Sequence, residues 1–300
     1  NNVVGYQAGD AITTGHSNDI MGYQAATALT TGYANVVIGK GAFAAADGGE
    51  QNNVAIGFGA GASVNHNNTT ANVWIGSWAG TGGTGYQSNN VAVGDDAMVG
   101  IGNQNAHYNT AIGRAALGGT MTNDSTGNTA IGYWAMKGPI ADAQYNTSVG
   151  YQSLDALTSG NYNVAIGSDT LGSVTTGGSN IGIGRLAGAN HTTANGNMYI
   201  GYAAGYSNQT GTGNTIIGNS SYGQSAVAGL NISNVTTLGH EAGYYATGSS
   251  NTFIGAEAGK GNSSAPYSSG GYNVALGAEA LKAFTTAKRM VAIGYEAMTD

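Results

Sequence analysis

The side chains that could carry acid/base, nucleophilic or metal chemistry are few in this chain. It has no cysteine, and its five histidines, residues 16, 66, 107, 191 and 240, lie in or beside loop-like segments. We expect these histidines to be solvated rather than to bind a metal or act in catalysis. Asp95 and Asp96 are adjacent, so on an extended chain their carboxylates point to opposite sides and form a poor pair for glycoside cleavage.

No motif of a known reaction class is present either. The zinc-protease helix, the P-loop, the nucleophile elbow and the calcium-binding nonapeptide are absent from the sequence. Residues 182–187 match a loose dinucleotide-binding fingerprint, but no crossover helix follows them. A net charge of −7 disfavours nucleic acid as a partner, and no apolar run reaches the length of a membrane span. We therefore expect no enzyme, no cofactor and no membrane insertion by this segment.

A repeat supplies the elements that position the side chains. A glycine preceded by an aliphatic residue returns about every 18 residues, and we call it the anchor glycine, position 0 of the repeat. A short fixed period indicates a solenoid, whose units contact only their neighbours. The sequence predicts one continuous domain over 1–300, an all-β parallel β-solenoid of about 17 coils within a longer fibrous protein. The anchor glycines are residues 5, 22, 39, 57, 76, 94, 113, 132, 150, 167, 184, 201, 218, 239, 255, 277 and 294.

The three residues before each anchor glycine are predicted to form a short strand. Position −1 is aliphatic in every copy and position −3 is Val or Thr in most, so we expect both to line the coil interior. Position −2 should then face outwards, yet it too is apolar in most copies. A strand that is apolar on both faces is buried on both, so we predict that position −2 packs against sister chains. The candidate interface residues are Ala92, Ala111, Ala130, Ala165, Ala275 and Ala292.

Three further positions define the predicted framework. Position −4 is Asn in all copies but two, Val235 and Met290, and stacked amides should hydrogen-bond along the coils as a ladder. The anchor glycine should lie where the chain bends sharply or another backbone comes close. Position +3 is always small, which suggests that a second strand crosses the coil there. Ladder and anchor residues include Asn53, Asn109, Asn128, Asn163, Asn197, Gly57, Gly113, Gly132, Gly167 and Gly201.

Two irregular features indicate possible binding sites. Position +2 is Glu in the last four copies, Glu241, Glu257, Glu279 and Glu296, and this row is either a solvated surface or attracts Ca²⁺ or neighbouring lysines. The longest intervals between anchor glycines run from Gly218 to Gly239 and from Gly255 to Gly277. Insertions in solenoids form outward loops. Candidate contacts to carbohydrate or protein are Asn262, Ser264, Tyr267 and Tyr272, although an insertion without a role is an open alternative.

The repeat resembles those of known fibrous proteins. The phrases Asn-Val-Ala-Ile-Gly at 53–57 and 163–167, and Asn-Thr-Ala-Ile-Gly-Tyr at 128–133, are similar to the head repeats of YadA-like trimeric autotransporter adhesins. They resemble still more the repeat arrays of phage tail-fibre proteins. The resemblance covers essentially the whole chain, and it implies a left-handed β-roll assembled as a homotrimer. YadA-like coils are commonly shorter, so the additional residues here should form outward loops.

The resemblance also implies a function. It suggests an extracellular, cell-surface or virion location and attachment to a host glycan or protein receptor. Fold alone does not determine function, so two alternatives stay open: a structural spacer or self-assembling filament whose surface binds nothing in particular, and a glycan-cleaving enzyme. The enzyme would need a pair of acidic residues in a groove, and the sequence shows no such pair.

Overall fold

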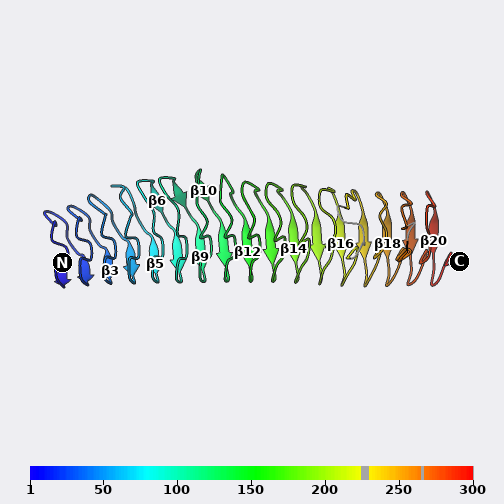
Figure 1. Ribbon diagram of the computed structural model, residues 1–300, viewed down its shortest axis with the longest axis horizontal. Coiled ribbons are helices and arrows are strands. Elements are labelled where there is room, and N and C mark those ends of the chain that lie inside the picture. Colours follow the sequence, from blue (N-terminus) through cyan, green and yellow to red (C-terminus); the bar gives the residue numbers. More distant parts are fainter. Residues whose placement is uncertain (224–229, 265–266, 300) are drawn as a thin grey trace. The chain divides into compact units, whose positions relative to one another are not determined.

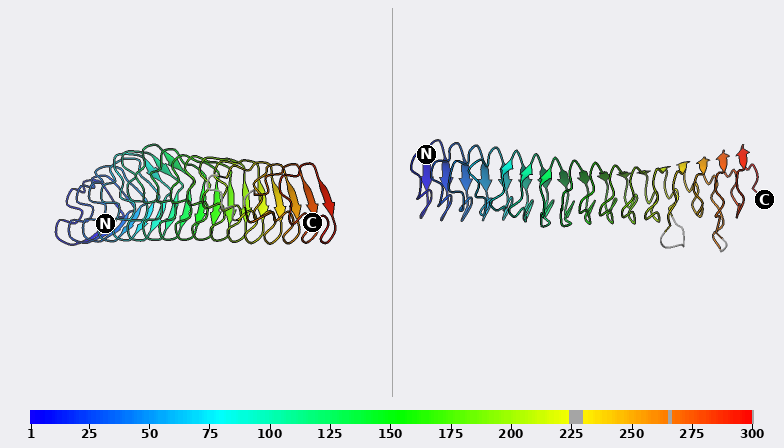
Figure 2. Two further views of the ribbon diagram at one scale, coloured as in Figure 1. Left: turned by 45° about the vertical axis from the view of Figure 1, so that its right-hand side comes forward. Right: turned by 90° about the horizontal axis from the view of Figure 1, so that it is seen from above.

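A computed structural model describes residues 1–223, 230–264 and 267–299. This part of the chain consists of short strands and turns, without a helix. It forms two compact units, Asn1–Ser159 and Gly160–Asp300. Each unit is a parallel β-solenoid in which a three-residue strand returns once per coil, with the period near 18 residues that the sequence predicts. Figures 1 and 2 show the strands of each unit side by side and pointing the same way, with the loops beyond them.

The first unit contains one long sheet and one short sheet. Neighbouring strands of the long sheet pair in parallel, so that equivalent repeat positions lie opposite each other, as Ala130 does opposite Ala111. The long sheet consists of β1 (Asn2–Val4), β2 (Asp19–Met21), β3 (Val36–Ile38), β4 (Val54–Ile56), β5 (Val73–Ile75), β7 (Val91–Val93), β9 (Thr110–Ile112), β11 (Thr129–Ile131) and β12 (Thr147–Val149). The short parallel sheet consists of β6 (Gln87–Ser88), β8 (Ala106–His107) and β10 (Ser125–Thr126).

The second unit has one parallel sheet with the same register of repeat positions. Its strands are β13 (Val164–Ile166), β14 (Ile181–Ile183), β15 (Met198–Ile200), β16 (Thr215–Ile217), β17 (Thr236–Leu238), β18 (Thr252–Ile254), β19 (Val274–Leu276) and β20 (Val291–Ile293). In the right-hand view of Figure 2 the orange segment on both sides of residues 265–266 extends beyond the neighbouring coils, as expected for an insertion.

The strands face the opposite way from the prediction. Position −2 lies inside the coil, while positions −3 and −1 lie on its outer surface. The predicted interface residues Ala92, Ala111, Ala130, Ala165, Ala275 and Ala292 are 0–2% exposed within a single chain, so they cannot contact a sister chain. The prediction was wrong because both strand faces are apolar, and alternation alone does not say which face is enclosed.

The residues at positions −2 and +4 have complementary sizes, as expected if both lie inside the coil. In most coils where position −2 is alanine, the space is filled from position +4 by a large residue such as Leu117 or Met136, both fully buried. Where it is Trp74, position +4 is glycine in its own coil and in the preceding one. A Cβ on Gly80 would lie 1.8 Å from Trp74, and one on Gly61 would lie 2.8 Å from it. Positions −2 and +4 therefore fill one core together, at close packing.

The turn after each strand replaces the second strand predicted at position +3. In the coil of Gly132, Trp134 and Met136 adopt positive φ values of 58° and 50°, which coil the chain tightly around the buried Ala135. The Ala135 carbonyl accepts a hydrogen bond of 2.9 Å from the Leu117 N–H of the preceding coil. Position +3 is small because this turn leaves no room for a longer side chain. The second ladder of strands instead precedes the main strand, as β6, β8 and β10.

The predicted asparagine ladder is present and buried. The Asn128 Nδ2 donates to Asn109 Oδ1 at 3.2 Å, and its own Oδ1 accepts from the backbone N–H of Asn146 at 3.0 Å. The same pattern links Asn35 to Asn53 in the first unit, and Asn180 to Asn197 in the second. These side chains are 0–2% exposed. Each ladder amide thus satisfies buried polar groups in neighbouring coils, which would otherwise cost about 1–3 kcal/mol each.

The anchor glycines lie where backbones come closest. Gly132 has a φ of +135°, and a Cβ there would stand 2.4 Å from the Gly150 carbonyl oxygen of the next coil. Gly57 and Gly201 have φ values of +138° and +129° with similar contacts to the next anchor glycine. Residues with a side chain rarely adopt such φ values. Glycine at position 0 is therefore required both by conformation and by the spacing of the coils.

Val235→Asn is expected to stabilise the second unit by about 1 kcal/mol. The ladder is interrupted there: Val235 is fully buried, and its N–H donates to Asn214 Oδ1 at 3.0 Å, but it offers no side-chain oxygen to Asn251. An asparagine of similar volume supplies that acceptor. The measurement is the free energy of unfolding in urea. Val37→Asn is the matched control, since Val37 is equally buried in the apolar core, and it should destabilise the chain. Destabilisation at both positions would contradict the prediction.

Candidate binding surfaces

The outer face of each sheet is an apolar stripe, which we define as the side chains at positions −3 and −1. Ile112 in the first unit is 39% exposed and Ile166 in the second is 41% exposed, although both are stacked between neighbours of the same kind. Asp19 is the one charged residue at these two positions. Monomeric soluble proteins rarely expose such continuous apolar surface. The stripe is therefore a candidate protein–protein interface in each unit.

The glutamate row of the second unit is paired with lysines. Lys260 Nζ lies 2.6 Å from Glu241 Oε2 and 3.2 Å from Glu257 Oε2, and Lys282 Nζ lies 2.8 Å from both Glu257 Oε2 and Glu279 Oε2. Glu241, Glu257 and Glu279 thus have lysine partners, which is one of the possibilities left open for this row. Glu296 lies beside Tyr295, whose pKa it raises by a side-chain hydrogen bond. Alternating charges of this kind remove the repulsion that four stacked carboxylates would otherwise have.

The pKa values follow from this pairing. The hydrogen bond from Lys282 lowers the pKa of Glu257, against a smaller opposite effect of burial. Burial alone would lower the pKa of Lys260, but its hydrogen bonds to Glu241 and Glu257 together raise it. The same bonds to Glu257 and Glu279 raise the pKa of Lys282. The row is thus a chain of fixed opposite charges at neutral pH.

The predicted binding-loop residues do not all line one surface hollow. Asn262 lines a shallow surface hollow together with Lys260 and Lys282, and its backbone N–H donates to Ser268 Oγ at 2.9 Å. Its side chain accepts from the Ser264 N–H at 3.0 Å and so shapes the loop. Tyr267 is half-buried and Tyr272 is 64% exposed, and neither lines this hollow. Tyr272 instead occupies position −5, next to the asparagine ladder.

Four histidines lie on the surface or close to it. His16 stacks on Tyr33, with ring centroids 5.1 Å apart, and His66 stacks on Tyr86 at 5.4 Å. Half-buried His107 lies 2.9 Å from Ser88 Oγ, and burial lowers its pKa. His240 is exposed, with its Nε2 3.8 Å from Glu241. Over residues 1–223, 230–264 and 267–299, no cluster of three His, Asp or Glu side chains could hold a metal ion.

His191 was predicted to be a solvated loop residue and is instead fully buried. Its Nε2 lies 3.0 Å from the Ala194 carbonyl oxygen, and its Nδ1 lies 3.4 Å from the Tyr199 hydroxyl. Asn208 donates to that hydroxyl at 2.8 Å. These partners bind a neutral imidazole, and burial lowers the pKa of His191. The missed signal was Tyr199 at position −2, whose hydroxyl requires a partner inside the coil.

The stability of the second unit is expected to fall below pH 6.5 through His191. The folded state keeps the imidazole neutral, whereas the unfolded state takes up a proton near the ordinary pKa of 6.5. Folding free energy is therefore lost as pH falls from that value towards the lower pKa of the folded state, at up to about 1.4 kcal/mol per pH unit. The measurement is urea unfolding of the wild type and His191→Gln between pH 7.5 and 5. Parallel pH profiles for the two proteins would contradict this assignment.

Comparison with known proteins does not assign the chain to a family. No protein-family model, no curated protein and no solved structure matches the chain. In the part of the chain that the structure describes, no helix is long and apolar enough to cross a membrane.

Proposed function

We propose that the chain is a non-enzymatic segment of a trimeric attachment fibre, displayed outside a cell or on a virion. The observation that carries the proposal is the apolar stripe at positions −3 and −1. It runs along the long sheet of the first unit and the sheet of the second, and one chain alone leaves it open to water. A rigid stack of coils with such a stripe suits a long, thin assembly of identical chains. The stripe, and not position −2 as the sequence suggested, is proposed to pack against sister chains.

The trimer is proposed to form by packing the stripes of three chains around a common axis in a left-handed β-roll. The stripe is almost without charge, and the central parts of obligate interfaces are likewise depleted of charged residues. Apart from Asn2 and Asp19, the side chains at these positions are β-branched or aliphatic, which suits close packing between pleated surfaces. The remaining surface, with its loops and exposed tyrosines, stays free to contact a host glycan or protein receptor.

The double variant Ile112→Glu/Ile131→Glu is expected to convert the trimer into a folded monomer. Both side chains point away from the coil interior, so the coil itself should survive. Six carboxylates would meet at the proposed trimer axis, where burying unpaired charge costs several kcal/mol. Sedimentation equilibrium gives the mass, and circular dichroism reports the fold. Thr120→Glu, at an exposed site away from the strands, should leave the trimer intact.

Two outcomes would contradict the assembly. A wild-type chain that sediments as a stable monomer contradicts the trimer, and a double variant that keeps the trimeric mass of the wild type contradicts the stripe as its interface. The attachment part is tested by binding of the fluorescently labelled wild-type chain to bacterial and animal cells. A trimer that binds no surface supports the structural spacer instead.

A further inference from the structure

A gap in the side-chain columns of the second unit forms a small hollow on its surface. Position +5 is Tyr206, Gly223 and Tyr244 in three successive coils, and position +2 of the middle coil is Ser220. The middle coil therefore offers little side-chain volume between two tyrosines. The hollow measures about 200 Å³. Its lining is Leu186, Tyr202, Ala203, Tyr206, Ser220, Gly223 and Tyr244.

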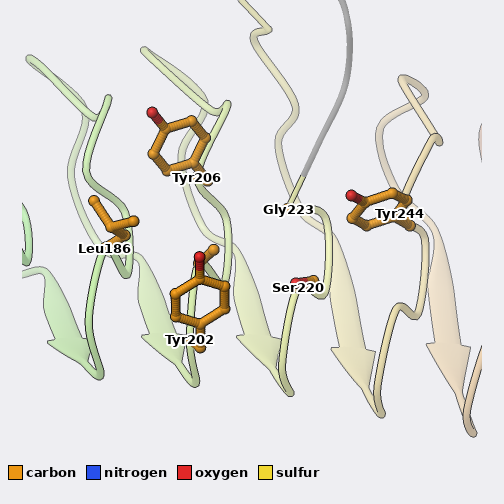
Figure 3. A pocket seen from close by; sticks show the side chains of 7 residues that line it. Leu186, Tyr202, Tyr206, Ser220, Gly223 and Tyr244 are labelled. Carbon is orange, nitrogen blue, oxygen red and sulfur yellow. The ribbon is translucent and has the colours of Figure 1, made fainter.

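Figure 3 shows how these side chains surround the hollow. Tyr202 and Tyr206 come from one coil and Tyr244 from the coil beyond the one that carries Ser220 and Gly223. The Tyr244 hydroxyl points towards that middle coil. Two coil spacings of about 4.8 Å separate equivalent positions, so Tyr206 and Tyr244 stand roughly 10 Å apart at their backbones. Tyr202 is 46% exposed, so a ligand can reach its ring.

We propose that this hollow binds a neutral pyranose unit of a glycan. The lining contains no formal charge but has four hydroxyl groups, from three tyrosines and Ser220. The lining itself gives a phosphate, a carboxylate or an acidic sugar no cationic partner. The Arg185 guanidinium lies outside the lining, against the Tyr202 ring, so acidic glycans are the rival ligands that the array must separate from neutral ones. A pyranose has C–H groups that pack on the electron-rich faces of aromatic rings, and hydroxyls that hydrogen-bond to those at the edge.

The size and surroundings favour a sugar over the other neutral or cationic ligands. Pockets for drug-sized molecules have roughly 300–1,000 Å³, so a hollow of about 200 Å³ suits a single ring. A quaternary ammonium ion also binds between aromatic rings. However, the Arg185 guanidinium already lies 5.8 Å from the centroid of the Tyr202 ring. A second cation there would be repelled, whereas a neutral sugar is not.

The inference rests on the proposed attachment function and specifies its ligand. The hollow lies at the start of the first long interval, from Gly218 to Gly239, where the sequence departs from the regular repeat. The predicted contacts Asn262, Ser264, Tyr267 and Tyr272 belong to the second interval, and none of them lines this hollow. The glycan site is thus assigned to tyrosines that the insertion pattern alone did not single out.

The test is binding of the full chain to an array of neutral and acidic oligosaccharides, with choline-agarose as the rival ligand. The neutral oligosaccharide that binds best on the array is then titrated by calorimetry. Ser220→Trp fills the hollow with a residue that the fold accepts, because Trp78 and Trp134 occupy the same repeat position with φ values of 56° and 58°, against 54° for Ser220. Gln152→Trp makes the same change at position +2 of another coil and is the matched control.

We expect Ser220→Trp and Tyr244→Ala each to weaken binding of the neutral oligosaccharide at least tenfold, while Gln152→Trp binds as the wild type does. Binding to acidic glycans or choline alone, or full binding by Ser220→Trp, overturns the inference. Cell binding by the wild type that is unchanged in Ser220→Trp removes the hollow as the site but leaves the attachment function. A wild type that binds neither cells nor any glycan removes both.

Discussion

Replacing Gly132 by alanine is expected to destabilise the first unit by roughly 3–5 kcal/mol. Two costs add at this residue. Its φ of +135° is strained for any residue with a side chain, and the new Cβ would stand 2.4 Å from the Gly150 carbonyl oxygen. Because that oxygen belongs to backbone, the clash cannot be relieved by rotating a side chain. The coils of Gly132 and Gly150 must separate, which weakens the hydrogen bond of 2.8 Å from the Gly150 N–H to the Ile131 carbonyl.

The matched control for this prediction is Gly41→Ala. Gly41 also has a positive φ, +65°, but a Cβ there would meet no atom within 4 Å. Its expected cost is about 1–2 kcal/mol, that of an alanine in the left-handed region. Free energies of unfolding in urea give the comparison. Equal losses for the two variants would show that conformation alone, and not the approach of the next coil, selects the anchor glycine.

Trp74→Ala is expected to cost the first unit about 3–5 kcal/mol. The indole is fully buried and lies 5.8 Å from the Phe43 ring between centroids. Gly61 and Gly80 leave space for it, so truncation opens a cavity that no neighbouring side chain can fill. The loss should appear in urea unfolding of the wild-type and variant chains.

Gly80→Leu provides a sharper test of the same packing. In the wild-type background the leucine Cβ would lie 1.8 Å from the indole, so the substitution should be strongly destabilising. In the Trp74→Ala background it should recover part of the lost stability. The double variant has alanine at position −2 and leucine at position +4, the same combination as Ala111 and Leu117 in the coil of Gly113. Met98 and Leu117 already occupy the equivalent position with φ values of 54° and 50°. Additive losses in the double variant would refute the shared core.

Much of the fold follows from the sequence because the period fixes it. The anchor glycines set the length of each coil, and the asparagine ladder and the strand positions were predicted at the residues where the structure has them. These features depend on single residue types at fixed spacing. Asn and Gly have physical roles that few other residues can take, so their recurrence is informative.

The direction of the strands could not be predicted from alternation. Positions −3, −2 and −1 are apolar in most copies, and a strand of three residues has no further alternation to decide the question. The usable signal was compensation between distant positions. Trp74, Tyr199 and Phe253 at position −2 coincide with glycine at position +4, as at Gly80, Gly205 and Gly259. When a large residue at one position coincides with glycine at another, the two positions share one core.

The surface features were harder to predict for a different reason. The pairing of Lys260 and Lys282 with the glutamate row depends on where position +5 stands relative to position +2 of the neighbouring coil. The hollow beside Tyr244 depends on the small residues of a neighbouring coil, not on a motif. Both arise from stacking, so they appear only when coils are placed against one another.

The buried asparagine ladder has a consequence for the ageing of the molecule. Deamidation begins when the backbone nitrogen after an asparagine attacks its side-chain amide, and it is fastest before glycine. In the ladder that nitrogen is occupied: the Thr129 N–H, which follows Asn128, donates to the Asn146 carbonyl at 2.8 Å. The exposed pair Asn195 and Gly196 has neither burial nor a bulky following residue. Deamidation of this protein should therefore begin at exposed loop asparagines such as Asn195. The buried amides of the asparagine ladder, which link the coils, should react more slowly.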